Sequence, residues 1–457
     1  MKFEPQKRAH SPQFVEARRK SRPVGAVELA SESKNSKLSY GRRFQAACCG
    51  ELQKRLVVLI VLIPLLLFFS ATSLKAADIT IKPRIATSWK TDDNFFKAET
   101  GERKVDTYLV QPGIDLGFET PRTKVLLNYT LNAYYYDDRD TVPSGQLKAN
   151  DDDYVGHTVV FNSRYRAFDR LLIGLDDSYN KTRDSADSDR LSNATDRDKY
   201  EVNRLTPSFF YDFGAKFTAG LRYRNTTIDY SKNDNEDSIE HRGMFDLIYN
   251  FTRKTSLDLE YQHWKKDYDK TTSDYTSDQI QMIFKKQFNY IEIKAGGGYH
   301  ERDFDDPTLN SIDTMAYTIS VRAQNPPAPE TRPRSYLELS SELNFNDQGV
   351  ADSYYKAHRF SVDAGHIFLE KLKLDVGGYY QNSDYERTTG LTPEGTTEFR
   401  DDDTYFISGS IGYIFADYLT LSVSANYEDR NSNLSGYDYD NKSVMATLDF
   451  GYDIGRR

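Results

Sequence analysis

One histidine stands close to several carboxylates and could take part in hydrolytic chemistry. Among the histidines beyond residue 77, only His300 stands near such a cluster, formed by Asp303, Asp305 and Asp306. A histidine oriented by an aspartate is a general base in many hydrolases. No nucleophile elbow or glycine-rich phosphate loop accompanies it, and Gly296–Gly298 lies inside a strand-like pattern. The sequence therefore favours a protein without enzymatic activity.

Runs of aspartate offer a second kind of chemistry, because hard carboxylate oxygens suit calcium. The runs are Asp151–Asp153, Asp184–Asp189 and Asp401–Asp403. None has the spacing of an EF-hand, with its central glycine and distal glutamate. We therefore expect solvated surface loops, bridged to anionic lipopolysaccharide by divalent ions, and we predict no resident metal or cofactor.

Charged residues also recur on the polar face of segments whose other face is apolar. In a water-filled interior such side chains stay solvated without strict pairing. Basic residues concentrate near the fifth predicted strand and acidic ones near the fourteenth, which predicts a transverse field that would orient polar solutes or a charged glycan. The alternative is a general polar lining with no selective role. The candidate lining residues are Arg164, Arg166, Lys216, Arg222, Arg224, Asp258, Glu260, Lys294, Glu338, Glu342, Asp363 and Asp375.

The segments that carry these residues have a period of two. From Tyr108 to Phe118 every second residue is apolar, and the alternation resumes from Val125 to Tyr135 after a break at 119–123. Successive strand side chains point to opposite faces, so this stretch predicts an antiparallel hairpin with one apolar and one polar face. The same pattern recurs at 216–224, 314–324, 372–381 and 419–428.

Short breaks alternate with long acidic segments between the predicted strands. The breaks fall near Pro121, Asp169, Gly214, Arg253, Asn289, Pro326–Pro333, Glu370 and Asp417. The long segments are Asp92–Lys104, Asp137–Asp153, Asp184–Asp198, Asn233–Asp237, Asp305–Asn310, Thr388–Asp403 and Asn431–Gly436. This alternation predicts an all-β, antiparallel up-and-down transmembrane barrel of about 16 to 18 strands, 18 being favoured, with short periplasmic turns and long extracellular loops.

A soluble propeller or solenoid is the alternative, because its repeats also give hairpins at a period near 40 residues. Its core strands would be apolar on both faces, whereas here one face is charged. A lipid-facing sheet must close on itself, since the bilayer has no water to satisfy open edges. Tyrosine runs at Tyr134–Tyr136, Tyr354–Tyr355 and Tyr379–Tyr380 favour an aromatic girdle, although tyrosine is also common in strands generally.

Composition excludes some function classes. The chain has 457 residues, a net charge of −9 and only two cysteines, Cys48 and Cys49. Residues 1–77 hold 14 Lys+Arg against 5 Asp+Glu, so the remainder is more acidic than the whole chain, and nucleic acid is an unlikely partner. No disulfide framework or cysteine metal site is available beyond residue 49.

The N-terminal region has the pattern of a secretory signal peptide. Lys54 and Arg55 precede the apolar run Leu56–Phe69, and small residues follow up to Ala77, which predicts cleavage near Ala76 or Ala77. A transmembrane anchor is the alternative, but the run is shorter than the ~20 residues of a span. Three regions result: an unpatterned basic leader at 1–51, for which a translation start at Leu52 is our hypothesis, a signal peptide at 52–77, and a barrel at 78–457.

Three short motifs resemble a known family, the outer-membrane barrels called beta-barrel porin 2. They are Asp92–Phe96, Gln111–Gly113 and the strand Leu127–Tyr136. The resemblance implies a barrel over residues 78–457 and a link to exopolysaccharide or capsule export, and it carries over no catalytic residue. The chain departs from common outer-membrane proteins because its last residues, Ile454–Arg457, lack a terminal aromatic.

We therefore expect an outer-membrane barrel of a Gram-negative bacterium that acts as a passive conduit for polar solutes, including exopolysaccharide. The expected partners are outer-membrane lipid, lipopolysaccharide, polysaccharide and proteins of an export machinery. A closed barrel whose loops act as a receptor or adhesin is the alternative. Planar-bilayer conductance separates the two.

Overall fold

The computed structural model describes most of the chain beyond residue 76. None of the helices among these residues is long and apolar enough to cross a membrane. The predicted leader, nearly all of the predicted signal peptide and the acidic run Asp184–Asp189 lie outside the described residues. The described residues are 77–144, 148–183, 198–231, 236–270, 272–325, 333–347 and 354–454.

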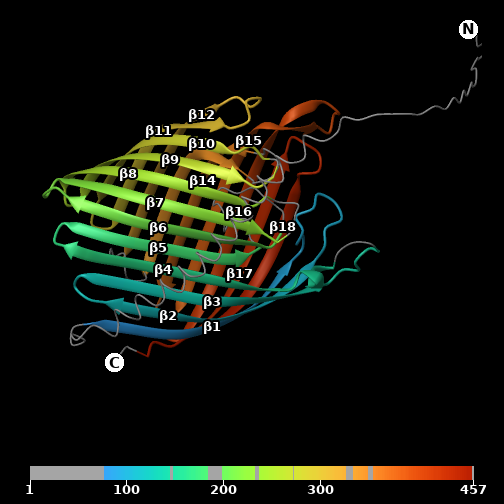
Figure 1. The fold of residues 1–457 in the computed structure, drawn as a ribbon. Coiled ribbons are helices and arrows are strands. Elements are labelled where there is room, and N and C mark those ends of the chain that lie inside the picture. Colours follow the sequence, from blue (N-terminus) through green and yellow to red (C-terminus); the bar gives the residue numbers. More distant parts are fainter. Residues whose placement is uncertain are drawn as a thin grey trace, which may run out of the picture. The chain divides into compact units, whose positions relative to one another are not determined.

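Eighteen strands and one short 3₁₀ helix make up the described structure (Figure 1). The helix, η2, covers Ala149–Asp152 between β3 and β4. The strands are β1 Asp78–Asp92, β2 Val105–Glu119, β3 Thr123–Asp138, β4 Tyr154–Phe168, β5 Leu171–Thr182, β6 Tyr200–Asp212, β7 Phe217–Tyr230, β8 Ser238–Thr252, β9 Thr255–Tyr268, β10 Tyr275–Gln287, β11 Ile291–Phe304, β12 Ile312–Asn325, β13 Ser335–Asp347, β14 Tyr354–Phe368, β15 Leu372–Leu391, β16 Thr397–Ala416, β17 Leu419–Ser432 and β18 Tyr439–Gly451.

The strands form one closed antiparallel sheet. Each strand pairs with its neighbours in sequence, and β1 also pairs with β18, from Arg84 opposite Gly451 to Asp92 opposite Ser443. Closure leaves no edge strand whose backbone groups would face lipid. The predicted 18-stranded up-and-down barrel is confirmed.

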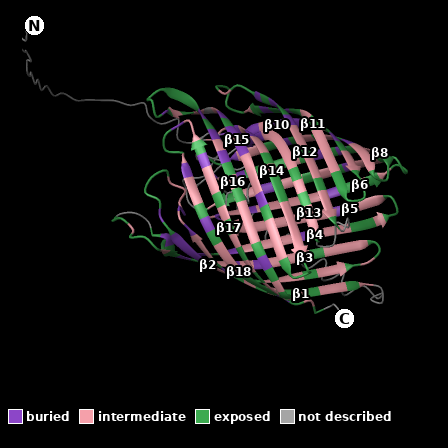
Figure 2. Cartoon of the chain, turned by 180° about the vertical axis from the view of Figure 1, so that it is seen from behind, coloured by how far each residue is buried: buried purple, intermediate pink, exposed green. Residues whose placement is uncertain are grey.

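The register sorts the side chains between the two faces. Ile81 lies opposite Leu116, and its neighbour Lys82 lies opposite Asp115, so apolar residues share one face and charged residues the other. Large apolar side chains on the first face are exposed, and exposed segments alternate with half-buried ones along the strands in Figure 2. The apolar face is therefore the outer surface, and the charged face lines the lumen.

Aromatic residues on the outer face gather at both ends of the strands. Trp89, Tyr108 and Tyr135 lie near the loop ends, and Phe213 and Phe251 lie near the turns; all are exposed. These are the two interfacial girdles of a transmembrane barrel.

The tyrosine runs divide between the two faces. Tyr135 is 53% exposed, but Tyr136 is only 5% exposed. Tyr136 packs with Phe95 on the inner side of the loop rim, which is the end of the barrel that carries the long loops. Likewise Tyr355 is fully buried, against Tyr385. The interpretation of whole runs as girdle was wrong, because the period of two sends alternate tyrosines inward.

The two rims have different connections, as the sequence predicts. All eight connections at the predicted breaks join strands on one rim, and seven of them are short. One predicted loop, Thr388–Asp403, is wrong: β15 and β16 continue as a hairpin with Thr389 opposite Phe399 and Asp384 opposite Asp401. Its polar composition suggested a loop, but polar side chains also form the packed face of this hairpin, where the buried Arg400 bonds to Asp402. Part of the predicted loop Asn233–Asp237 lies outside the described residues.

Candidate functional site: the inner wall of the barrel

Eleven of the twelve candidate lining residues lie on the inner face of strands. Lys216 is the exception, because it lies exposed in the turn just before β7. The other candidates are Arg164 and Arg166 on β4, Arg222 and Arg224 on β7, Asp258 and Glu260 on β9, Lys294 on β11, Glu338 and Glu342 on β13, Asp363 on β14, and Asp375 on β15.

Arg222 joins three neighbouring strands across the wall. Its Nε and Nη2 donate to the two carboxylate oxygens of Asp246 on β8, at 2.9 and 2.6 Å. The same Nη2 donates to Oε2 of Glu260 on β9 at 2.5 Å. A planar guanidinium suits this paired geometry better than an ammonium does.

A glycine makes room for this network. A Cβ at Gly220 would overlap the ring of Phe210 and stand 3.0 Å from Asp246 Oδ2. The absent side chain at Gly220 therefore lets Phe210 and the carboxylate occupy one section of the wall.

A second network lies nearer the loop rim. Glu240 accepts hydrogen bonds from Arg224 at 2.9 Å and from Arg242 at 2.9 and 3.0 Å. The Arg242 guanidinium also stacks 3.8 Å from the ring centre of Trp264. Glu240 and Arg242 were not among the sequence candidates, although both belong to the polar face of β8.

Pairing weakens the predicted transverse field. Arg164 forms two 2.8 Å hydrogen bonds with Asp176, and Arg222 and Arg224 are paired as described above. The expected basic wall is therefore locally neutralised. On the other wall Glu338 lies directly opposite Asp363, and the nearest guanidinium nitrogen to Glu338, that of Arg322, is 3.9 Å away. The inner wall carries mixed charge with a local acidic group.

The predicted histidine cluster at the rim does not form. His300 points to the inner side, is only 1% exposed, and its Nδ1 lies 2.7 Å from Asn344 Oδ1. It packs against Trp264 with ring centres 4.9 Å apart. Asp303 belongs to the opposite face of β11 from His300, and Asp305 lies in the following loop. Alternation therefore separates these aspartates from the histidine.

The acidic runs are tied into the protein. Asp153 accepts the Tyr136 backbone N–H at 2.8 Å, and Asp152 lies 3.0 Å from Arg183. Asp402 is fully buried and bonds to Arg400. The interpretation of Asp401–Asp403 as a solvated loop was wrong, since these residues belong to β16. Among the described residues no group of three carboxylate, histidine or cysteine side chains could hold a metal ion.

The β1–β2 loop contacts the neighbouring strands β17 and β18 at the loop rim, which the sequence did not indicate. Asn94 is fully buried, and its side chain bonds to Ala98 and to the Asp440 carbonyl at 2.9 Å. Lys97 then places its Nζ 2.8 Å from Glu428 on β17. The motif Asp92–Phe96 thus ties this loop to the strands of the barrel seam.

Carboxylates crowd the other loops of the same rim. Burial, followed by the Asp237 carboxylate, raises the pKa of Asp269 in the β9–β10 loop. Burial also raises the pKa of Asp274 in that loop, with a further contribution from Asp267. The loop rim therefore carries closely spaced acidic groups.

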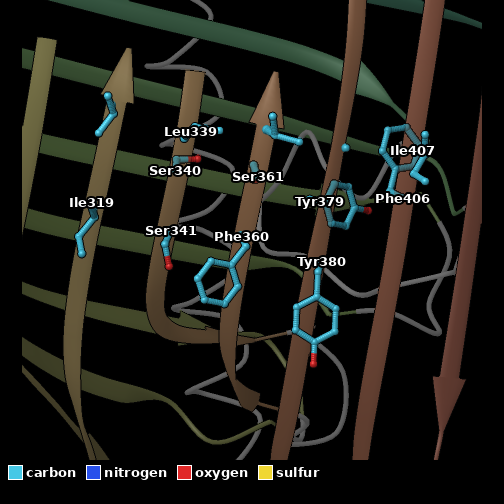
Figure 3. A pocket seen from close by; sticks show the side chains of 13 residues that line it. Ile319, Leu339, Ser340, Ser341, Phe360, Ser361, Tyr379, Tyr380, Phe406 and Ile407 are labelled. Carbon is cyan, nitrogen blue, oxygen red and sulfur yellow. The ribbon is translucent and has the colours of Figure 1, made fainter. Parts of the chain in front are cut away.

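One shallow groove lies on the outer surface rather than in the lumen. Its volume is about 560 Å³, and outward side chains of β12 to β16, including Ile319, Leu339, Phe360 and Ile407, surround it (Figure 3). An apolar groove at this position faces the membrane. It is no candidate for a polar solute.

Comparison with known proteins gives a family match over the last eight strands. The family described as "Putative beta-barrel porin 2" matches residues 292–452. The resemblance is confirmed, but the match covers β11 to β18 rather than the N-terminal motifs. No curated protein matches the chain.

Several solved structures are similar in outline. Pseudomonas aeruginosa OpdK with vanillate is 11% identical with a TM-score of 0.45, and P. aeruginosa OccK9 (OpdG) is 12% identical with 0.44. Both alignments cover 82% of this chain and 99% of the other. Acinetobacter baumannii OccAB2 is 11% identical with 0.43, covering 82% and 98%. The fold assignment rests on the strand pairing, and with the family match it makes this chain a porin-like β-barrel of the outer membrane of a Gram-negative bacterium.

Proposed function

We propose that the barrel is a passive conduit for polar solutes across the outer membrane. The observation that carries the proposal is the inner wall, where charged side chains from neighbouring strands face the lumen as mixed pairs such as Arg222 with Asp246. A barrel of 18 strands has an interior wide enough for water, in which such groups remain hydrated. We expect no enzymatic activity, because the candidate base His300 is buried.

The solute class follows from the family resemblance. Polysaccharides are polar, flexible and hydrated, and a mixed polar wall gives them hydrogen-bond partners without a tight site. We therefore include exopolysaccharide and its fragments among the solutes, with an export machinery and lipopolysaccharide as partners. Swelling of liposomes that contain the folded protein, in oligosaccharides of increasing length, measures this permeability; exclusion of every oligosaccharide contradicts it.

Planar-bilayer recording tests the conduit itself. Folded protein in neutral lipid should give discrete conductance steps in KCl. Absence of steps from protein that retains heat-modifiable migration on gels would overturn the open conduit. That result would favour the receptor or adhesin, for which the β15–β16 hairpin exposes Leu391 and Phe399.

Export also requires a leader. We propose that residues 52–77 are a signal peptide cleaved near Ala76 or Ala77, and that residues 1–51 are dispensable. N-terminal sequencing of the membrane-inserted protein checks the cleavage position. Loss of export on deletion of codons 1–51 would contradict the second part.

A further inference from the structure

The turn rim, which is the end of the barrel that carries the short turns, has unpaired positive charge. Arg170 in the β4–β5 turn, Lys216 in the β6–β7 turn, Arg253 in the β8–β9 turn and Lys371 in the β14–β15 turn are all exposed. Within the described residues none of the four has an ion-pair partner. These four side chains are therefore available to an anionic partner outside the barrel.

Few carboxylates offset this charge. The acidic residues in the described parts of the turns are Asp169, Glu370 and Asp417. Asp169 lies 3.5 Å from Arg122, and both side chains are well exposed, so this pair is weak. The turn rim is thus basic, although the protein as a whole is acidic.

The loop rim has the opposite sign. Burial is the first cause that raises the pKa of Asp269 and of Asp274, and nearby carboxylates add to it: Asp237 for Asp269, and Asp267 and Asp305 for Asp274. Asp305 and Asp306 follow β11 in a loop that contains no basic residue, although Lys265 of β9 lies 3.6 Å from Asp305. Short turns face the periplasm and long loops face the outside in barrels of this class. The axis of the barrel therefore runs from a basic periplasmic rim to an acidic outer rim.

The two rims act independently on a solute. A strand of 15 residues such as β1 is about 50 Å long and, tilted by about 40°, rises roughly 38 Å. The Debye length is about 8 Å at physiological salt. A solute at one mouth therefore responds mainly to the charges of that mouth.

The spacing of the basic turns favours a polymer over a small ion. Strands about 4.8 Å apart and tilted by about 40° place successive turns of one rim about 12 Å apart. Arg170, Lys216 and Arg253 occupy three successive turns, so they span about 25 Å of rim. A small anion reaches one of them, whereas a polyanion contacts several and releases the corresponding counterions.

We propose that the basic turn rim, defined by Arg170, Lys216, Arg253 and Lys371, captures an anionic polysaccharide from the periplasm, and that the acidic loop rim disfavours its return. This inference rests on the proposed conduit function and adds the charge class and the direction of the solute. Contact with anionic phospholipid headgroups is the competing role for these side chains.

Side-specific block of single channels tests the inference. The protein is inserted in phosphatidylcholine bilayers, and its orientation is read with an impermeant thiol reagent on Ala215→Cys, since the chain has no other cysteine after Cys49. Dextran sulfate is then added to one side, with neutral dextran of equal length as the control polymer. We expect block from the turn side at about tenfold lower concentration in 0.15 M KCl, and no such difference in 1 M KCl, where screening is stronger.

Charge reversal supplies the matched variants. The triple variant Arg170→Glu, Lys216→Glu and Arg253→Glu should lose the side difference. A triple variant of exposed loop-rim lysines, Lys104→Glu, Lys148→Glu and Lys442→Glu, should keep it. Both sets lie outside the inner wall, and heat-modifiable migration checks that the variants fold.

Each result has one meaning. Absence of conductance defeats the conduit itself. Normal conductance with equal block from both sides, or a side difference that survives the turn-rim reversal, overturns the inference. The inference also fails if the reversal weakens binding to phosphatidylglycerol vesicles while the block by dextran sulfate stays unchanged, because the turn rim is then a lipid contact.

Discussion

A single guanidinium balances two carboxylates at Arg222, and this makes the residue a test of the inner wall. Arg222→Gln leaves Asp246 and Glu260 without their shared cation. We expect the zero-current potential in a KCl gradient to move toward the potassium equilibrium potential, because the local wall becomes negative. The Arg222 side chain is 26% exposed, so the stability loss should stay below the ~3–5 kcal/mol of a fully buried pair.

Arg222→Lys is the matched control, since it keeps the charge and loses the paired geometry. Its ion selectivity should stay close to that of the native barrel. If the Gln and Lys variants have the same selectivity as the native protein, the Arg222 network does not face the conducting path.

The two faces of β3 give a second residue-scale prediction. Leu127 shares the outer face with its partner Leu116, whereas the side chain of Asn128 donates to Asp115 at 2.9 Å on the inner face. Leu127→Arg should cost about 2 to 4 kcal/mol near the bilayer midplane. Asn128→Arg should cost much less, because water and Asp115 compensate the charge. Urea unfolding in lipid vesicles measures both, and equal costs would contradict the assignment of the faces.

Alternation along a strand is a local property, and this explains which site residues could be predicted. The parity of Arg164 or Asp363 follows from the sequence alone, and the structure places both on the inner face. Their partners depend on register between strands, so the pairing of Arg164 with Asp176 could not be predicted. His300 is a different case: the alternation itself places Asp303 on the opposite face of β11, and only the partner Asn344, which is 44 residues away, depends on register.

At the scale of the element, composition misleads where strands leave the membrane. Residues 388–403 are polar and were predicted as a loop, but β15 and β16 are 20 residues long and continue above their neighbours. Asp401 pairs with Asp384, and the backbone N–H of Asp401 donates to the side chain of Asn433. One face of this hairpin is packed through polar side chains such as Arg400 and Asp402, which are buried, so the apolar face that marks a strand is absent.

Close approach of strands β13, β14 and β15 depends on a glycine. A Cβ at Gly365 would overlap the ring of Tyr336 and lie 2.6 Å from Asp375 Oδ1. Gly365→Val should therefore destabilise the barrel by about 1 to 3 kcal/mol. The measurement is the urea midpoint of the heat-modifiable, folded form.

Gly409 on β16 provides the control, because a Cβ there would meet no atom within 4 Å. Gly409→Val should leave the midpoint unchanged or raise it, since valine favours strands. Similar losses at both positions would show that any branched residue disturbs the sheet, and would contradict the role given to Tyr336 and Asp375.

At the scale of the whole molecule, strand number was predictable because tight turns can be counted. Each of the eight predicted breaks joins two strands, and the first and last strands, β1 and β18, pair with each other to close the sheet. The stagger of that closure was not predictable, because no turn connects β18 back to β1. The stagger is set by the pairing of β1 with β18, which begins with Arg84 opposite Gly451.

A designed crosslink tests the closure directly. Ser88 on β1 and Thr447 on β18 lie opposite each other on the inner wall, with their hydroxyl oxygens 2.9 Å apart. Ser88→Cys with Thr447→Cys should form a disulfide, because facing residues of antiparallel strands have the short Cβ separation that the bond requires. The linked chain should stay more compact than the reduced chain after boiling in detergent, since the loop between the two positions contains almost the whole barrel.

Ser88→Cys with Ala446→Cys is the matched control for this crosslink. Ala446 precedes Thr447 and points to the outer face, so the two thiols would lie on opposite sides of the sheet. This pair should remain reduced under the same oxidant. Efficient linkage of the control, or none in the facing pair of a folded barrel, would mean that β1 and β18 meet in a different stagger. A shift of one residue would exchange the inner and outer faces of one of the two strands relative to the other.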